Sequence, residues 1–406
     1  MNFASFIASR ISFRSKRTFS KLIVRIAVAG IMLGLGVMVL SFAIMKGFKQ
    51  EVREKIRGFS GDIQVLKLDL NTSYENSPVA DSPAFVAQLK AKKLYTHIMP
   101  FATIPCIIKA NDEIEGVVMK GVNRDYDWAF FNKIMVAGKV PDFRDTVASQ
   151  KQIMISQHTA DRLKLKVGDD FLMYFIKESL HKRKFKITGI FTTGIEEVDK
   201  TFVVGDINLI RKINHWPPDY IGGYEIQVKQ FEDIDAANAA MADVIPTTLK
   251  TFTVMESFAQ IFDWLTKIDI NTQIMLVLML IVAVINMISA MLIMILERTA
   301  MIGMLKAMGA RTQTIQQIFL INAFYLISLG LILGNAFGLG IAYLQQQSHW
   351  IKLDQESYYM KYVPIKVEWL DVVELNLGTL VISLIVLIGP SLLVSRILPV
   401  KAIQFK

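Results

Sequence analysis

Residues 297–311 read ERTAMIGMLKAMGAR, and this short stretch stands between two long apolar runs of the chain. Ile302, Leu305 and Met308 recur at helical spacing, and Gly309 can end the helix that they predict. The runs on either side are long enough to cross a membrane. A charged helix held in so tight a connection indicates that something outside the membrane acts on it.

Four stretches without a charged residue explain why 52% of the 406 residues are hydrophobic. At about 1.5 Å of rise per residue, roughly 20 residues cross the ~30 Å hydrocarbon core of a membrane. The first stretch is too long for a cleavable signal peptide and has no small-residue cleavage site, so we interpret it as a retained anchor. The sequence therefore predicts an α-helical membrane protein with four transmembrane helices, at residues 26–46, 274–296, 318–344 and 375–395.

The net charge comes from segments beside these spans. Residues 1–25 carry +6, residues 297–311 carry +2 and residues 396–406 carry +3, so within a total of +9 the rest of the chain has −2. Cytoplasmic flanks of membrane helices are enriched in Lys and Arg. Both termini and the central connection are therefore predicted to be cytoplasmic, with residues 47–273 and 345–374 on the opposite side. Since the basic excess of the chain lies in these membrane flanks, a nucleic-acid partner is not expected.

Residues 1–25 alternate apolar and basic side chains. Phe3, Phe6 and Ile7 recur at helical spacing among arginines. This pattern predicts an amphipathic helix that lies on the cytoplasmic leaflet, and a plain positively charged flank is the alternative.

Residues 47–273 form a block large enough to have an apolar core of its own. The predicted elements read βαββ over residues 60–123 and βαβ over residues 221–256, which together indicate one split, porter-like α+β lobe. Residues 124–220 between them are strand-rich, and we interpret them as a second, inserted β-rich lobe. The fold class is thus a four-helix membrane protein with a large α+β domain outside the membrane.

The two ends of this block continue the helical pattern of the neighbouring spans. Residues 48–56 and 258–270 are predicted to lengthen the first and second transmembrane helices beyond the membrane. Flexible linkers are the alternative, and the scarcity of Gly, Pro and Ser argues against them.

The residues that would carry catalysis are not arranged for it. The sequence has no Gly-x-x-x-x-Gly-Lys-Ser/Thr loop for ATP phosphates, its five histidines are scattered singly, and it has no Gly-x-Ser-x-Gly elbow. Cys106, the only cysteine, stands in an apolar run that favours a buried structural thiol over a reactive one. Residues 26–45, 274–296, 318–344 and 375–395 hold no Asp, Glu, Lys or Arg, which argues against an ion-coupled transporter. We therefore expect a non-catalytic chain that binds no metal and no cofactor.

The stretch 297–311 resembles the signature of the four-span permeases that work with a separate ATPase. That group includes the macrolide-exporter, cell-division and lipoprotein-releasing permeases. The residues that match are Glu297, Arg298, Thr299, Ile302, Gly303, Leu305, Ala307, Gly309 and Ala310. Ala300 and Met301 depart from the pattern, which has a charged pair there with an acid at the second position. The resemblance implies an ABC transporter permease of the FtsX/MacB-like superfamily.

In that family this segment is a coupling helix, docked in a groove of the ATPase. The resemblance therefore implies that residues 297–313 contact a partner ATPase, and that the partner binds ATP and Mg²⁺. The implied ATPase-coupling residues are Glu297, Ile302, Gly303, Leu305, Lys306, Met308 and Gly309.

The rest of the chain is similar to the lipoprotein-releasing branch, the LolC/LolE-type permeases. Residues 188–191 (TGIF) and 194–199 (GIEEVD) carry this likeness in the outer block, whereas residues 389–403 are similar to the chain ending of the wider permease family. The resemblance implies a bacterial inner-membrane permease with a periplasmic domain, which extracts lipoproteins for delivery to the outer membrane. The implied partners are a LolD-like ATPase, a second permease copy or paralogue, the lipoprotein substrate, membrane lipid and a LolA-like periplasmic chaperone.

The connection at residues 176–184 (IKESLHKRK) departs from that branch. One of its two permeases carries an extended hairpin that hooks the chaperone, whereas the connection here is short and strongly basic. We expect chaperone docking to use a different surface or a partner subunit.

The resemblance also implies a lipid-facing cavity between the first and second spans. Methionine and aromatic side chains adapt to irregular apolar guests. Candidates for the lining are Met38, Phe42, Met45 and Phe48, and ordinary lipid contact or helix packing is the alternative. Close approach of the first span to other helices is predicted by its small residues, Gly30, Gly34 and Gly36.

Two other functions fit the same four-span pattern. One is an FtsX-like relay that activates periplasmic cell-wall hydrolases, and the other is a MacB-like exporter permease. The large outer block favours transport over the relay.

Overall fold

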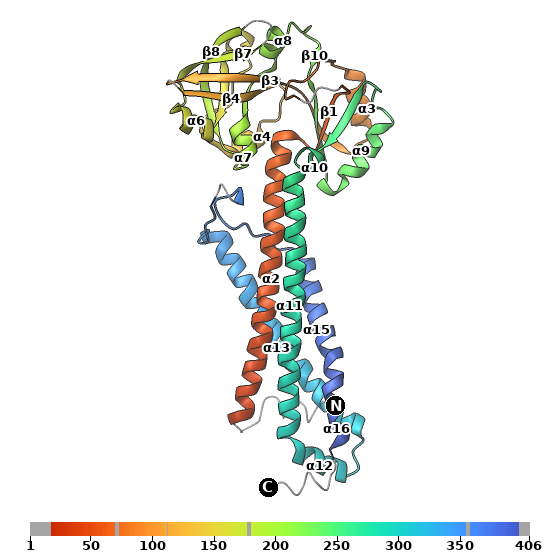
Figure 1. Ribbon diagram of the computed structural model, residues 1–406. Helices are drawn as coiled ribbons and strands as arrows, with labels where there is room; N and C mark the ends of the chain where they lie inside the picture. Colours follow the sequence, from red (N-terminus) through yellow and green to blue (C-terminus); the bar gives the residue numbers. More distant parts are fainter. Residues whose placement is uncertain (1–17, 70–72, 112, 177–179, 355–357, 398–406) are drawn as a thin grey trace. The chain divides into compact units, whose positions relative to one another are not determined.

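The computed structural model describes residues 18–69, 73–111, 113–176, 180–354 and 358–397. The chain divides into two compact units, which we call the helical unit and the sheet unit (Figure 1). The helical unit comprises Met1–Gln50, Trp264–Lys352 and Tyr362–Lys406, and the sheet unit comprises Glu51–Asp263 and Leu353–Lys361. Most of the predicted N-terminal amphipathic helix and most of the predicted C-terminal tail lie outside the described residues.

The helical unit is built on four long helices. They are α2 (Thr18–Ser60), α11 (Ala259–Glu297), α13 (Thr312–Ser348) and α15 (Trp369–Ser391), and the short α16 (Leu393–Arg396) follows the last of them. Within the described part of the chain, four helices are long and apolar enough to cross a membrane, which confirms the four predicted spans. α2 has 43 residues and α11 has 39, so both continue as helices beyond their predicted spans, as expected.

Glycines let α2 approach two neighbouring helices closely. A Cβ atom on Gly30 would lie 1.7 Å from the side chain of Asn286 on α11, and one on Gly36 would lie 2.7 Å from Phe337 on α13. On the facing helix, a Cβ atom on Gly338 would lie 2.7 Å from the backbone of Gly36. Small residues at helix contacts are typical of membrane bundles, where close packing drives association. The close approach predicted from the glycines of the first span is confirmed.

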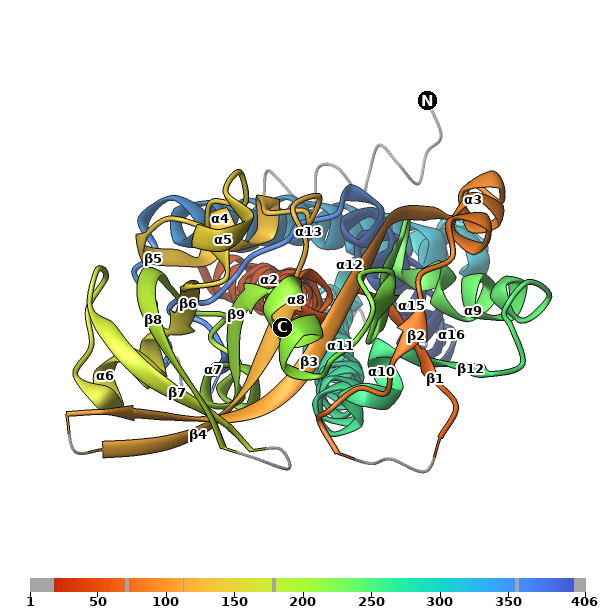
Figure 2. The ribbon, with the colours of Figure 1, turned by 90° about the horizontal axis from the view of Figure 1, so that it is seen from above.

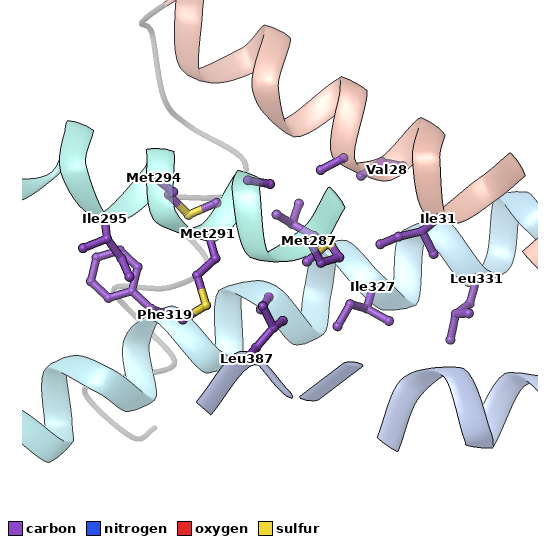
Figure 3. Packing of buried hydrophobic residues seen from close by; sticks show 14 of the residues in the cluster. Val28, Ile31, Met287, Met291, Met294, Ile295, Phe319, Ile327, Leu331 and Leu387 are labelled. Carbon is purple, nitrogen blue, oxygen red and sulfur yellow. The ribbon is translucent and has the colours of Figure 1, made fainter. Parts of the chain in front are cut away.

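The core of the bundle is a continuous apolar cluster. Figure 3 shows side chains from four helices meeting in it, with methionines of α11 between the branched residues of α2 and α13. The labelled members are Val28, Ile31, Met287, Met291, Met294, Ile295, Phe319, Ile327, Leu331 and Leu387. Unbranched methionine side chains fill the irregular gaps that glycine-mediated crossings leave.

A pair of asparagines joins α13 to α15. The Asn335 amide donates to the side-chain oxygen of Asn376 at 2.8 Å, and the Asn376 amide donates back at 3.0 Å. Each amide also donates to the carbonyl four residues earlier in its own helix. Hydrogen bonds between polar side chains hold membrane helices together, because lipid offers no other partner.

The sheet unit contains one mixed sheet of ten strands. Its order is β12-β1-β11-β3-β4-β9-β6-β8-β5, and β7 pairs with β3 and β8. The strands are β1 (Ile63–Lys67), β3 (Tyr95–Ala110), β4 (Glu113–Val122), β5 (Met135–Gly138), β6 (Gln152–Ser156), β7 (Asp170–Ile176), β8 (Leu180–Phe191), β9 (Phe202–Asp206), β11 (Gly223–Val228) and β12 (Leu249–Thr253). A separate two-stranded sheet pairs β2 (Val79–Ala80) with β10 (Tyr220–Ile221).

The helices of the sheet unit are short. They are α3 (Pro83–Ala91), α4 (Ala129–Ile134), α5 (Thr146–Ser149), α6 (Gln157–Leu163), α7 (Glu196–Thr201), α8 (Ile207–Ile213), the 3-10 helix η1 (Phe231–Asp233), α9 (Ile234–Ala242) and α10 (Val254–Ser257). Their starts follow from local sequence. The Ser82 hydroxyl accepts from the backbone N–H of Phe85 at 3.3 Å, and Thr253 with Glu256 forms a capping box.

The long strand β3 joins the two lobes that the sequence predicts. Figure 2 shows β3 crossing the sheet unit, with β1 and α9 to one side in this view and β7, β8 and α6 to the other. Its first residues, Tyr95–Phe101, pair with β11, and later residues pair with β4 and β7. β4, assigned from sequence to the split lobe, pairs with β9 of the inserted segment. Backbone pairing in the sheet therefore continues across the predicted lobe boundary after residue 123.

A buried ion pair fixes the end of α2 to the sheet. Lys120 on β4 lies 2.7 Å from Glu225 on β11, and both side chains are 2% exposed. The Lys120 ammonium also donates to the carbonyl of Phe59 at the end of α2, and it lies 4.5 Å from the centre of the Phe59 ring. Burial lowers the pKa of Lys120 and raises the pKa of Glu225. This contact provides a partner for a carbonyl at the helix end, where the last turn has none of its own.

Candidate coupling site

Within residues 297–311, the structure forms the helix α12 (Thr299–Ala307), which lies between α11 and α13 in the sequence. Gly309 has a φ of +87°, the left-handed conformation that glycine adopts without strain. Its N–H donates to the carbonyl of Lys306 at 3.0 Å, and the N–H of Ala310 donates to the carbonyl of Leu305 at 3.0 Å. These two bonds make a Schellman motif. Gly309 therefore ends the helix as predicted, and α13 starts three residues later, at Thr312.

One face of α12 packs into the bundle. Ile302 is fully buried and Leu305 is 7% exposed, and both belong to the apolar cluster that includes Ile315 of α13 and Val394 of α16. Gly303 between them is also buried. The sequence indicated that Ile302, Leu305 and Met308 recur on one face, whereas the structure buries Ile302 and Leu305 and leaves Met308 exposed. The reason is that α12 must first cover the end of its own bundle, which takes the two branched side chains.

The opposite face of α12 is apolar and open. Met304 is 53% exposed and Met308 is 75% exposed. Ala300 and Ala307, which recur with them at spacings of three and four residues, are exposed as well. Exposed methionines at adjacent positions are typical of surfaces that bind another protein, since their flexible side chains adapt to a partner. The sequence analysis missed Met304, although its spacing of four from Met308 could have indicated it.

Lys306 is used inside the chain. Its ammonium donates to the carbonyl oxygens of Val394 at 2.8 Å, Ser395 at 3.1 Å and Ile397 at 2.9 Å. The family resemblance implied that Lys306 contacts the ATPase, whereas in the structure its ammonium bonds to carbonyls at the end of α16. Of the other predicted coupling residues, Glu297 is half-buried at the end of α11 and Gly309 is exposed.

The four residues predicted to line a substrate cavity lie in two different environments. Met38 is 3% exposed and belongs to the bundle core, and Phe48 is 7% exposed with its ring centre 5.3 Å from that of Trp264. These two side chains pack within the chain, as the alternative of helix packing expects. Phe42 and Met45 are half-buried. They are the two candidates that the structure leaves accessible.

Charged pairs lie beside these two residues. Lys46 of α2 bonds to Glu368 at 2.6 Å and to Asp371 of α15 at 2.8 Å. Lys49, one turn further along α2, pairs with Asp269 of α11. These ion pairs tie the outer part of α2 to both neighbouring helices.

The described residues contain no cluster of side chains that could bind a metal ion, and their cysteine is buried. No group of three or more His, Cys, Asp and Glu side chains among them is placed to hold a metal ion. Cys106 on β3 is buried, and burial raises the pKa of its thiol to about 12. A thiol with so high a pKa stays protonated at neutral pH, which fits the structural role predicted for it.

Two family models match the chain. The MacB-like periplasmic core domain matches residues 26–244, and the FtsX-like permease C-terminal domain matches residues 273–399. The chain belongs to this MacB/FtsX-like permease family. It is thus a permease of the ABC transporter class, a class whose membrane subunits work with an ATPase partner, and its four apolar helices fit a multi-pass inner-membrane protein.

Relatives from several bacteria match this permease over nearly its whole length. The lipoprotein-releasing system transmembrane protein LolC of Neisseria meningitidis is 20% identical, over 97% of this chain and 96% of that protein. The corresponding LolE protein of Haemophilus influenzae is 20% identical, over 96% of each chain. LolC of Buchnera aphidicola is 22% identical, over 92% of this chain and 91% of that protein.

Proposed function

We propose that this permease is the membrane subunit of an ABC transporter that extracts lipoproteins from the bacterial inner membrane for delivery to the outer membrane. The observation that carries the proposal is the match to LolC and LolE proteins over more than nine-tenths of each chain. The pyoverdine export ATP-binding/permease protein PvdT of Pseudomonas putida matches differently, since the alignment spans 76% of this chain but only 48% of that longer protein. The lipoprotein-releasing proteins therefore account for the whole of this chain.

The exposed face of α12 is the part that meets the ATPase in this proposal. Met304 and Met308 offer an apolar contact at the connection between α11 and α13. A partner ATPase, LolD-like, binds ATP and Mg²⁺, and closes when it does so. Because α12 is joined directly to two membrane helices, a push on it moves both. The permease itself supplies no catalytic residue and no nucleotide site.

The transported lipid passes α2 in this proposal. Phe42 and Met45 are half-buried apolar side chains of α2, and in this proposal they contact the acyl chains of a lipoprotein. Two permease chains, identical or paralogous, form the membrane part, with both termini of each in the cytoplasm and the sheet unit in the periplasm.

The periplasmic acceptor is a LolA-like chaperone. Ile176 of β7 pairs with Leu180 of β8, so the sequence leaves only three residues to connect the two strands. In this proposal the chaperone therefore binds to another surface or to the second permease.

Depletion of the permease in its own bacterium tests the proposal. Outer-membrane lipoproteins should then accumulate in the inner membrane, as measured by separating the two membranes and quantifying lipoproteins in each. A protein of the outer membrane that is not lipidated serves as the control and should keep its distribution. Normal lipoprotein sorting together with a defect in cell separation would overturn the proposal in favour of a relay to cell-wall hydrolases.

A further inference from the structure

Lys306 connects two elements that are not neighbours in the sequence. It lies on α12, between α11 and α13, but its ammonium bonds to three carbonyls at the end of α16. The last carbonyls of a helix have no partner within it and carry the negative end of its dipole. A lysine there is both a hydrogen-bond donor and a favourable charge. The contact therefore fastens the coupling helix to the end of the fourth span.

The fourth span is nearly continuous through α15 and α16. Pro390 lies in the last turn of α15, and the N–H of Leu392 bonds to the carbonyl of Gly389 at 3.1 Å, so the chain turns slightly and continues as α16. Along its length α15 is held to α13 by the reciprocal pair Asn335–Asn376. The carbonyls that Lys306 holds thus belong to the end of a long, braced helix.

The opposite end of α15 bonds to α2. Asp371 lies in its first turn and Glu368 is its N-cap residue, and both accept from the ammonium of Lys46. Acidic side chains at a helix start complement the positive end of its dipole, so these two carboxylates are well placed to hold a lysine. Lys46 is next to Met45, one of the two half-buried candidates for the cavity lining.

We propose that α15 and α16 form a transmission element, tied by Lys306 to the coupling helix and by Lys46 to the outer part of α2. This inference rests on the proposed function and assigns positioning roles within it. A push on α12 then reaches α2 by a second route, besides the direct connections of α12 to α11 and α13. Lys306 acts through α16 and does not contact the ATPase.

The test measures amide hydrogen exchange of α2 at residues 46–50 in the permease–ATPase complex in lipid nanodiscs, with and without a non-hydrolysable ATP analogue. In the unaltered complex the analogue should change the exchange rate there. Lys306→Met and Lys46→Met should each reduce that change about twofold, because each removes a charged group with several hydrogen bonds and leaves only the direct route. Lys306→Arg and Lys46→Arg, which keep the donors, should retain most of it.

Two comparisons separate transmission from a general structural effect. Lys267→Met, which removes an exposed lysine from α11, should behave as the unaltered complex does. The double variant Lys306→Met/Lys46→Met should be no worse than either single variant, because both act on one route. ATPase co-purification and ATP hydrolysis should persist in all of them.

Three outcomes would overturn the inference. They are an unchanged response in Lys306→Met, effects of the two lysine variants that multiply in the double variant, and loss of the ATPase from Lys306→Met. The readout needs no lipoprotein, so its outcome is distinct from that of the proposed function. A complex in which the ATP analogue changes hydrogen exchange of α2 but no lipoprotein is released would contradict the proposed function. The same result would still support the transmission element.

Discussion

Lys120 and Glu225 lie far apart in the sequence, yet they meet in the interior of the sheet unit with both side chains 2% exposed. A lysine in a strand is ordinarily interpreted as facing water, so the sequence analysis did not single it out. Asp199, by contrast, was singled out from the sequence, because it stands in residues 194–199, which carry the family resemblance. Its carboxylate accepts from the backbone N–H groups of Thr193 and Gly194, at 2.9 Å and 3.0 Å. That motif therefore contains a turn held by one carboxylate.

At this scale we predict the effect of Lys120→Met. Removing one partner of a buried ion pair leaves an uncompensated charge, which typically costs about 3–5 kcal/mol of the free energy of unfolding. Hydrogen exchange of β4 and β11 in the full-length protein in detergent should become faster accordingly. The double variant Lys120→Met/Glu225→Gln should recover part of the loss, since it also removes the orphaned charge. Equal protection in Lys120→Met and the unaltered protein would show that the pair does not stabilise the sheet.

The element whose properties follow best from the sequence is α12, and its limits are instructive. Its existence and its end at Gly309 were predictable, because a positive φ and the capping bonds depend on local residues. Which face turns inward was not, since apolar residues stand on both faces of the helix. Burial of Ile302 and Leu305 depends on α13, which follows α12, and on α16, which is distant in the sequence. The same holds for Lys306, whose hydrogen-bond partners lie 88 to 91 positions away in the sequence.

At the element scale we predict opposite consequences for two neighbouring positions. Met304→Asp puts a charge on the exposed face, so the permease should fold and reach the membrane but lose ATPase co-purification. Leu305→Asp buries an unpaired charge, at a cost of several kcal/mol, so it should reduce the amount of folded permease itself. Quantifying permease and bound ATPase after affinity purification distinguishes the two. Gln313→Asp, an exposed change at the start of α13, is the matched control and should alter neither quantity.

For the whole molecule, hydropathy and charge were enough to predict four spans and a large α+β domain, because membrane helices are recognisable one at a time. The pairing of strands was not predictable in this way. β3 has 16 residues and forms a local hairpin with β4, but it also pairs with β7 and β11, which are far from it in the chain. The segment Leu353–Lys361 between α13 and α15 also belongs to the sheet unit, where Lys55 donates to the carbonyl of Tyr359 at 2.6 Å. Contacts between segments so far apart in the chain cannot be predicted from a local sequence pattern.

The central claim is that this permease and its ATPase release lipoproteins from a membrane. The most direct measurement places the purified complex, with its second permease chain, in liposomes that contain a labelled lipoprotein, and adds a soluble periplasmic chaperone as acceptor. We predict that the labelled lipoprotein moves to the chaperone only when ATP is present, and that Met304→Asp abolishes this transfer. Vigorous ATP hydrolysis by an intact complex, with all of the lipoprotein remaining in the liposomes, would contradict it.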